Sequence, residues 1–253
     1  MASGSDMNKT ELPSVTIVVP VYNEQERIAA SLYDIKDYLE HQQYESNVMV
    51  IDDGSNDMTT EVVKFVDIYG SEFNSQSVGV LEENIKNVGK GYSIAKGLLK
   101  ADGDIIVFTD ADCSTPISEI DKLLQKIYEG YDVVIGSRHL EGSIVSGRGF
   151  IRSVMSRTFN LIARWSRLLE VRDSQCGFKA YTRDAARKIA AQQKTYGFCF
   201  DVEHLHIAKK LGCRITEVPV EWKHDKRSTI SPISDSVSML IELMKIRIIH
   251  RKL

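Results

Sequence analysis

Asp110 and Asp112 stand one residue apart at the end of an apolar run, residues 104–108. Isoleucine and valine in such a run favour a buried strand, so the two acids should emerge where a strand of an α/β sheet passes into a loop. Neighbouring carboxylates repel each other unless a cation lies between them and a ligand. Because hard oxygen donors with open coordination positions suit Mg²⁺ or Mn²⁺ carrying a diphosphate, the pair predicts chemistry on a nucleotide-activated substrate.

Strands and helices alternate along the chain. The predicted strands cover residues 15–21, 47–52, 78–82, 104–108, 132–136, 177–181 and 214–220. The predicted helices cover about 24–40, 58–69, 91–100, 116–127, 152–168, 183–191, 202–211 and 237–253. This rhythm implies crossover connections and one α/β domain whose mostly parallel, mixed sheet is flanked by helices.

The composition limits the function classes. The 253 residues are 43% hydrophobic and 26% charged, as in ordinary globular proteins. A formal net charge of -3 provides no basic field for nucleic acid. Four scattered cysteines lack zinc-site spacing and predict reduced thiols in an intracellular compartment. We see no signal peptide and no apolar run near the ~18 residues of a membrane span, so we expect no spanning helix.

Three parts are expected along the chain. Residues 1–13 predict a flexible leader, 14–228 the folded domain, and 229–253 a linker with a C-terminal amphipathic helix. Within the domain, residues 142–149 hold three glycines and predict a mobile loop.

Polar residues gather where four predicted strands end. The clusters are residues 20–24, 52–55, 110–112 and 136–138. Any one of them alone is typical of a polar turn with a helix cap. Because open α/β sheets bind ligands at the carboxyl ends of their strands, four clusters at one edge predict a site.

Several motifs resemble a known enzyme family. VVPVYNE at 18–24, DDGS at 52–55, NVGKG at 87–91 and TDAD at 109–112 resemble the inverting glycosyltransferases of family 2, which have the GT-A fold. IGSRHLEGS at 135–143, DSQCGFKAYTR at 173–183, FDVEHLHIAK at 200–209 and EVPVEW at 217–222 resemble the dolichyl-phosphate glucosyltransferases and related polyprenyl-phosphate enzymes. The resemblance runs from about Val15 to Met239 and therefore implies a single, Rossmann-like GT-A domain.

The resemblance also implies a donor site and a metal site. The donor-binding residues would be Pro20, Tyr22, Glu24, Asp53, Lys90, Asp110, Ala111 and Asp112. Asp110 and Asp112 would hold Mg²⁺ or Mn²⁺, with Asp112 as the direct ligand. Related mannosyl enzymes add a glutamine ligand two residues beyond the second aspartate. This chain has Ser114 there, so water can complete the metal's shell.

Residues 87–91 fail the P-loop pattern, since the upstream glycine and the Ser or Thr after Gly-Lys are absent. Two interpretations stay open for this segment. Its glycines and Lys90 can face a phosphate at the start of a helix, or they form a plain turn.

A second group of residues is implied for the acceptor. It consists of Arg138, Arg152, Ser156, Gln175, Lys179, Arg227 and Ser228. Arg152 and Ser156 lie four apart on one helix face, and two guanidiniums with a hydroxyl can clamp a phosphate monoester. The alternatives are solvated surface charges for the arginines and a strand-edge charge for Lys179. Arg227 and Ser228 stand where many relatives carry Gly-Ser-Lys.

The implied catalytic residues are Asp112, Arg138, Arg152 and Asp201. Asp201 either caps a helix or holds the sugar or the acceptor near the reaction. A phosphate acceptor is already largely ionised at neutral pH, so no strong general base is required.

The last predicted helix carries apolar residues along one face and basic residues near its end. Such a helix can lie in a membrane interface, or it can dock on the domain or on a second subunit of a homodimer. Without a spanning segment, membrane contact would be peripheral, at the cytoplasmic face of the plasma membrane or the endoplasmic reticulum.

The resemblance thus implies a metal-dependent inverting transferase that moves a hexose from a UDP-sugar, with UDP-glucose favoured, to dolichyl or polyprenyl phosphate. The product would be a β-linked lipid-phosphate sugar for glycan assembly. UDP-GlcNAc or GDP-mannose as donor, a soluble glycan or protein as acceptor, and an inactive nucleotide-sugar-binding subunit stay open as alternatives. No G-x-G-x-x-G follows the first strand, which disfavours a dinucleotide oxidoreductase.

Overall fold

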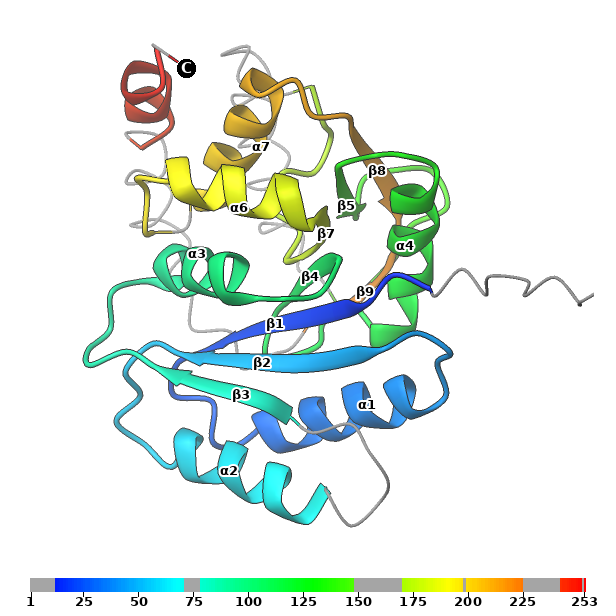
Figure 1. The fold of residues 1–253 in the computed structure, drawn as a ribbon, viewed down its shortest axis with the longest axis vertical. Helices are drawn as coiled ribbons and strands as arrows, with labels where there is room; N and C mark the ends of the chain where they lie inside the picture. The colour runs from blue at the N-terminus through cyan, green and yellow to red at the C-terminus, as the bar shows by residue number, and fades with distance from the viewer. Residues whose placement is uncertain (1–11, 71–77, 148–169, 198, 225–241, 252) are drawn as a thin grey trace, which may run out of the picture.

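A seven-stranded mixed sheet forms the centre of the molecule (Figure 1). The computed structural model describes residues 12–70, 78–147, 170–197, 199–224, 242–251 and 253. The sheet has the order β3-β2-β1-β4-β7-β5-β8. Its strands are β1 Val15–Val21, β2 Ser46–Asp52, β3 Val78–Glu83, β4 Ile105–Thr109, β5 Val133–Ser137, β7 Phe178–Thr182 and β8 Ile215–Pro219. All pairs are parallel except those of β7, which runs antiparallel to β4 and β5.

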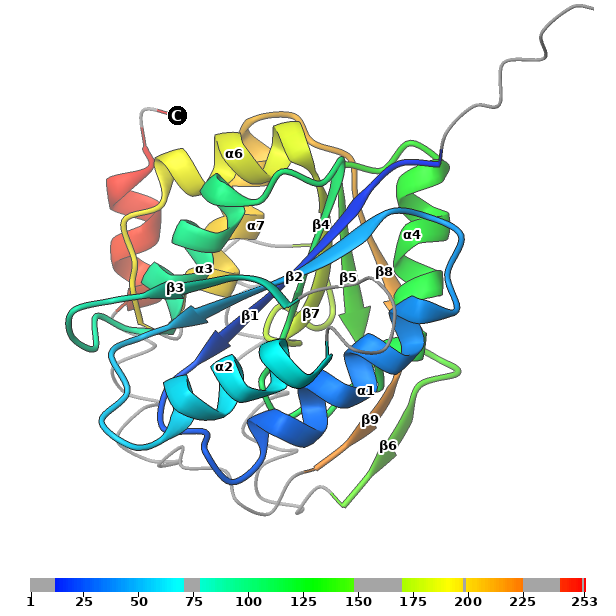
Figure 2. The ribbon, with the colours of Figure 1, turned by 60° about the horizontal axis from the view of Figure 1, so that its bottom comes forward.

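Helices cover both faces of this sheet. They are α1 Ile28–Glu40, α2 Thr59–Gly70, α3 Lys90–Lys100, α4 Ile120–Tyr128 after the short helix η1 Ile117–Glu119, α6 Arg183–Gln192 and α7 Phe200–Lys210. α1, α2 and α4 lie on one face, and α3, α6 and α7 lie on the other (Figures 1 and 2). Because both faces are covered, the central strands are continuous apolar runs, and every residue of β1 and β4 is buried.

The antiparallel strand β7 brings a second part of the chain to the carboxyl edge of the sheet. β1, β2, β4 and β5 end at this edge, whereas β7 begins there. Phe178 therefore pairs with Thr109, directly before Asp110. The segment that precedes Phe178 is thereby held beside the acidic pair.

The predicted α/β class and the mixed sheet are confirmed, with three local corrections. The helix predicted from residue 24 begins at Ile28, after a turn in which the Arg27 amide donates to the Glu24 carbonyl at 3.0 Å. The loop predicted at 142–149 contains strand β6, Ile144–Ser146. β6 pairs in parallel with β9, Glu221–Lys223, to form a separate two-stranded sheet. Neither short strand carries the alternating pattern that predicts one.

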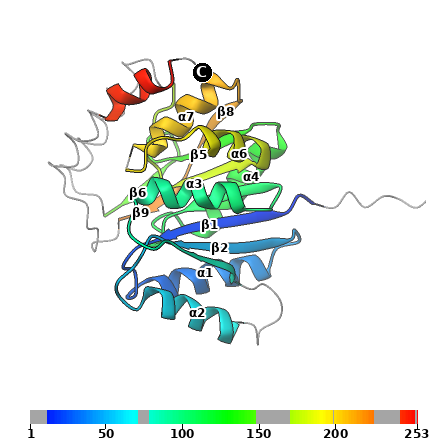
Figure 3. The same ribbon diagram turned by 60° about the vertical axis from the view of Figure 1, so that its left-hand side comes forward.

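Residues 242–249 form a helix near the C-terminus, and it lies beside α7 (Figure 3). Its inner side chains Leu243 and Ile246 are buried, so it docks on the domain. No helix in the described part of the chain is long and apolar enough to span a membrane. Residues 1–11 of the leader predicted over 1–13, the predicted helix 152–168 and residues 229–241 of the predicted C-terminal part lie outside the described residues.

Candidate active site

A pocket of about 350 Å³ opens at the carboxyl edge of the sheet. Its lining residues come from the end of β1 and the loop after it, from the loops after β2 and β4, from the segment that leads into α3, from the start of α3 and from the segment before α7. They are Pro20, Val21, Tyr22, Glu24, Arg27, Asp53, Asn87, Gly89, Lys90, Ser93, Asp110, Ala111, Asp112 and Gly197. All eight residues that the sequence predicts for donor binding are therefore brought together in one pocket.

The acidic pair lies in the loop after β4. The Asp110 amide donates to the Gly177 carbonyl at 3.2 Å, and its carboxylate forms an ion pair with Lys90. The same carboxylate packs so closely on Gly177 that a Cβ atom at residue 177 would overlap it. Asp112 accepts a hydrogen bond from the Ser114 amide at 3.0 Å through Oδ1. Cys113, between Asp112 and Ser114, has a φ of 43°, a conformation that non-glycine residues rarely adopt.

The two aspartates offer hard oxygen donors side by side, as Mg²⁺ or Mn²⁺ requires. Oδ2 of Asp112 accepts no hydrogen bond from a described residue. The described residues hold no group of three or more His, Cys, Asp or Glu side chains that could bind a metal, at the pocket or elsewhere, so the two carboxylates would leave the other coordination positions to water and a bound diphosphate. The residues present therefore fit a divalent cation at the pocket.

Lys90 forms an ion pair with Asp110, one of the two acids. It is the first residue of α3, directly after Gly89, whose φ of 120° is reserved for glycine. Burial opposes the charge on Lys90, but Asp110 and Asp201 outweigh burial and raise the pKa of the ammonium. Lys90 therefore stays protonated and offers positive charge to an anionic ligand in the pocket.

The Asp53 carboxylate lines the pocket and is held there by three hydrogen bonds. This buried carboxylate accepts hydrogen bonds from the Val88 amide at 3.1 Å and the Gly89 amide at 2.8 Å. The Asn84 side chain donates a third, at 2.9 Å. Asp53 lines the pocket as predicted, and it also fixes the loop that precedes Lys90.

Glu24 is held at the pocket by Arg27. The guanidinium Nη2 donates to Glu24 Oε1 at 2.6 Å, and the Glu24 amide donates to Thr59 Oγ1 at 2.7 Å. Arg27 itself lines the pocket, although the motif around residues 18–24 stops short of it.

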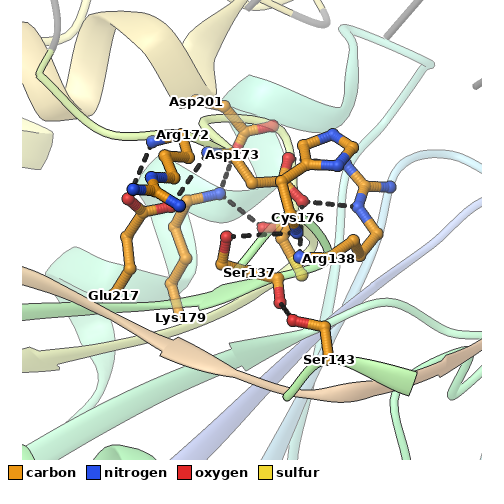
Figure 4. Close-up of polar contacts among 10 residues, drawn as sticks. Ser137, Arg138, Ser143, Arg172, Asp173, Cys176, Lys179, Asp201 and Glu217 are labelled. Atoms are coloured by element: carbon orange, nitrogen blue, oxygen red, sulfur yellow. Dashed lines mark hydrogen bonds and ion pairs between the residues drawn. The ribbon is translucent and has the colours of Figure 1, made fainter. Parts of the chain in front are cut away.

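Arg138 lies just after β5, outside the residues that line the pocket, and a buried carboxylate orients it (Figure 4). Its Nε and Nη2 donate to the two oxygens of Asp173 at 2.6 and 2.8 Å. Burial opposes the guanidinium charge, but Asp173, and at longer range Asp110, outweigh burial and raise the pKa of Arg138. The Arg138 side chain is only 11% exposed, so its charge lies inside the protein, and Asp110 is one of the carboxylates that favour this charge.

The loop that carries Asp173 is itself anchored. Glu217 of β8 accepts hydrogen bonds from the Arg172 amide at 2.7 Å and the Asp173 amide at 2.9 Å (Figure 4). Farther along this loop, Gln175 is half-buried, between Asp173 and Gly177.

The structure excludes one open interpretation for Lys179, a strand-edge charge, and one for Asp201, a helix cap. Lys179 lies in the interior strand β7 and is fully buried, so the interpretation as a strand-edge charge is wrong. Its ammonium pairs with Asp201 and donates to the Cys176 carbonyl at 2.6 Å (Figure 4). Asp201 follows the first residue of α7, so the helix-cap interpretation is also wrong. Burial raises the pKa of Asp201, while Lys179 and Lys90 oppose the rise.

The motifs do not single out two further residues of the site, Gly177 and Gly197. Gly177 leaves room for the Asp110 carboxylate, and Gly197 lines the pocket. The glycine inside DSQCGFKAYTR is a signal for the first of them. Four residues predicted for the acceptor, Arg152, Ser156, Arg227 and Ser228, lie outside the described residues.

The fold, the acidic pair and the pocket together define a glycosyltransferase. Residues 16–190 match the model of glycosyl transferase family 2, and the chain belongs to this family. The family resemblance drawn from the motifs is thereby confirmed.

Two relatives of the chain are dolichyl-phosphate β-glucosyltransferases. The chain is 35% identical to dolichyl-phosphate β-glucosyltransferase ALG5C of Trichomonas vaginalis over 93% of this chain and 71% of that protein. It is 32% identical to the dolichyl-phosphate β-glucosyltransferase of Homo sapiens over 95% of this chain and 79% of that protein.

Among solved structures, glucosyl-3-phosphoglycerate synthase from Mycobacterium tuberculosis, in complex with Mn²⁺, UDP and glucosyl-3-phosphoglycerate, superposes with a TM-score of 0.66. It is 18% identical, over 92% of this chain and 80% of that chain. At this identity the likeness establishes the shared GT-A-like fold.

Proposed function

We propose that this chain transfers glucose from UDP-glucose to dolichyl or another polyprenyl phosphate, with inversion, to give a β-linked lipid-phosphate glucose. The observation that carries the proposal is the similarity to dolichyl-phosphate β-glucosyltransferases, from 30 to 35% identity, over at least 92% of the chain. It spans the second-half segments around Arg138, Asp173 and Asp201 as well as the donor motifs.

The donor would bind in the pocket with its diphosphate near Lys90 and the acidic pair. Asp110 and Asp112 would hold Mg²⁺ or Mn²⁺, which supplies positive charge to a diphosphate leaving group. Lys90 adds a fixed positive charge at the start of α3, where the backbone amides also favour anions. Asp53 and Glu24 line the part of the pocket that would receive the nucleoside.

The acceptor phosphate would approach from the side of Arg138. An oxygen of the lipid phosphate bonds to the anomeric carbon as the bond from that carbon to the diphosphate breaks, and UDP leaves. Because the acceptor oxygen is already ionised, no proton has to be removed. Arg138, aligned by Asp173, offsets the repulsion between the two anions, and alignment with electrostatics supplies most of the acceleration.

A lipid acceptor places the reaction at a membrane surface, and we propose peripheral binding at its cytoplasmic face. The outer side of the helix over 242–249 exposes Met244, Ile248 and Ile249, with Lys245 exposed among them. Apolar side chains mixed with basic ones favour an interface with anionic lipids.

A donor screen tests the proposal. The purified protein is incubated with Mn²⁺, dolichyl phosphate and radiolabelled UDP-glucose, UDP-GlcNAc or GDP-mannose. We expect label in the lipid phase with UDP-glucose above the other two donors. A lipid product from UDP-GlcNAc or GDP-mannose alone would overturn the sugar assignment, and no lipid product from any donor would overturn the proposal.

A further inference from the structure

A buried carboxylate outside the pocket connects the C-terminal helix to the pocket wall. Glu203 lies in α7 and is fully buried. Its Oε1 accepts hydrogen bonds from the Lys194 amide at 2.9 Å and from His250 Nε2 at 2.6 Å. Its Oε2 accepts one from the Thr195 amide at 2.8 Å. One carboxylate thus joins the segment before α7 to the end of the C-terminal helix.

The segment held by Glu203 forms a wall of the donor pocket. Gly197 lines the pocket, and the Tyr196 carbonyl accepts a hydrogen bond from the Gly91 amide at 2.9 Å. A Cβ atom on Gly89 would overlap the Tyr196 carbonyl oxygen, so the two backbones are in direct contact on either side of Lys90. Residues 194–197 therefore cannot shift without moving the start of α3, where Lys90 is placed.

The C-terminal helix packs on the domain through buried side chains and approaches this wall at both of its ends. Leu243 and Ile246 are buried, and His250 is only 3% exposed. At the other end of the helix, Glu242 approaches the same wall. A Cβ atom on Gly197 would lie 3.1 Å from its Oε1.

We propose that Glu203 and His250 are positioning residues, through which the C-terminal helix fixes the 194–197 wall and Lys90 for the nucleotide diphosphate. The inference rests on the proposed donor, because UDP is the ligand that the wall would serve. It assigns the helix a part in donor binding that is separate from any contact with a membrane.

The test measures binding of UDP in the presence of Mn²⁺ by calorimetry for the wild type, His250→Leu and His250→Gln. Leucine removes the donor to Glu203, whereas glutamine can replace it. A matched control is Ile127→Val, which loosens the packing of α4 away from the pocket. We expect His250→Leu to weaken UDP binding about tenfold and His250→Gln to restore it to within about twofold. Ile127→Val should lower the melting temperature without changing UDP binding.

Equal UDP affinity in the wild type and His250→Leu would overturn the positioning role. Failure of the wild type to bind UDP would instead overturn the proposed donor, and the positioning role with it.

Amide hydrogen exchange of the wild type tests the same positioning role if His250→Leu does not fold. Saturating UDP and Mn²⁺ should slow amide hydrogen exchange at residues 194–197 and 242–249, but not in α4. Unchanged exchange in residues 242–249 on UDP binding would contradict the proposal.

Discussion

At the scale of single residues, the contact between Gly177 and Asp110 is the tightest constraint on the site. The carboxylate occupies the space that a side chain at position 177 would need. The glycine of the second-half motif thus fixes the orientation of an acid in the first half, although they lie 67 positions apart in the sequence.

Gly177→Ala should displace the Asp110 carboxylate and lower kcat/KM by about 100-fold, since a shift near 1 Å in a reacting site can cost that much. Steady-state kinetics and a melting curve check this. The control is Gly212→Ala, which has backbone strain at a φ of 76° but no atom within 4 Å. We expect the control to lose stability and to keep its activity. Wild-type kinetics in Gly177→Ala would refute the steric argument.

Arg138 has a structural role as well as the proposed catalytic one. Asp173 is fully buried, so removal of the guanidinium leaves a buried charge without its partner. We expect Arg138→Ala to destabilise the fold by about 3–5 kcal/mol, measured by urea unfolding. In Arg138→Ala/Asp173→Ala most of that loss should be recovered, while transferase activity stays low. Equal stability of Arg138→Ala and the wild type would contradict the paired geometry.

At the scale of elements, three of the buried polar side chains of α7 would not be expected on a surface helix. Asp201, Glu203 and His204 are buried together with its apolar residues. Each has a partner on another element, in β7, the 194–195 segment or Gln193. A helix buried all round gives little amphipathic signal, so its role could be taken only from the motif.

His204 should make stability depend on pH. Burial, and then the charge of Lys179, lower its pKa from 6.5 to about 3. Between these values the unfolded chain binds a proton that the folded protein does not, so acidification favours unfolding, by at most about 1.4 kcal/mol per pH unit. Comparison of urea unfolding at pH 6.5 and 4.5 should give a smaller loss for His204→Asn than for the wild type. Equal losses would show that His204 does not carry this dependence.

The sequence predicts the parallel strands, and the meeting of the donor-binding candidates in one pocket, because the signals for both are local. Asp110, Asp53 and Pro20 each follow a buried apolar run, and parallel strands bring such ends together. The burial of Lys179 could not be predicted, since it depends on the antiparallel insertion of β7 between β4 and β5. The bidentate pairing of Arg138 with Asp173 likewise joins residues 35 positions apart through tertiary packing.

At the scale of the whole molecule, the helix over 242–249 has a buried inner face and an exposed, partly apolar outer face. The inner one docks on the domain, as one of the two predicted alternatives requires, and the outer one exposes Met244 and Ile248 at 65% and 71%. Membrane contact, localisation and a homodimer stay predictions.

Met244→Ser/Ile248→Ser should weaken binding to vesicles containing an anionic lipid by about tenfold, because two apolar side chains no longer enter the interface. Cosedimentation with vesicles measures this, and UDP binding in solution serves as the control that should not change. Unaltered cosedimentation, or a shift from dimer to monomer in ultracentrifugation, would assign the outer face to a different partner.

In the proposed reaction, a cation held by Asp110 and Asp112, together with the buried Arg138, would bring a nucleotide sugar and a lipid phosphate together. The most direct measurement is UDP release from UDP-glucose with dolichyl phosphate, and with dolichol as the matched acceptor without the phosphate. We predict release with dolichyl phosphate alone, reduced at least about 100-fold in Asp112→Asn. Equal release with dolichol, or full activity of Asp112→Asn, would contradict the claim.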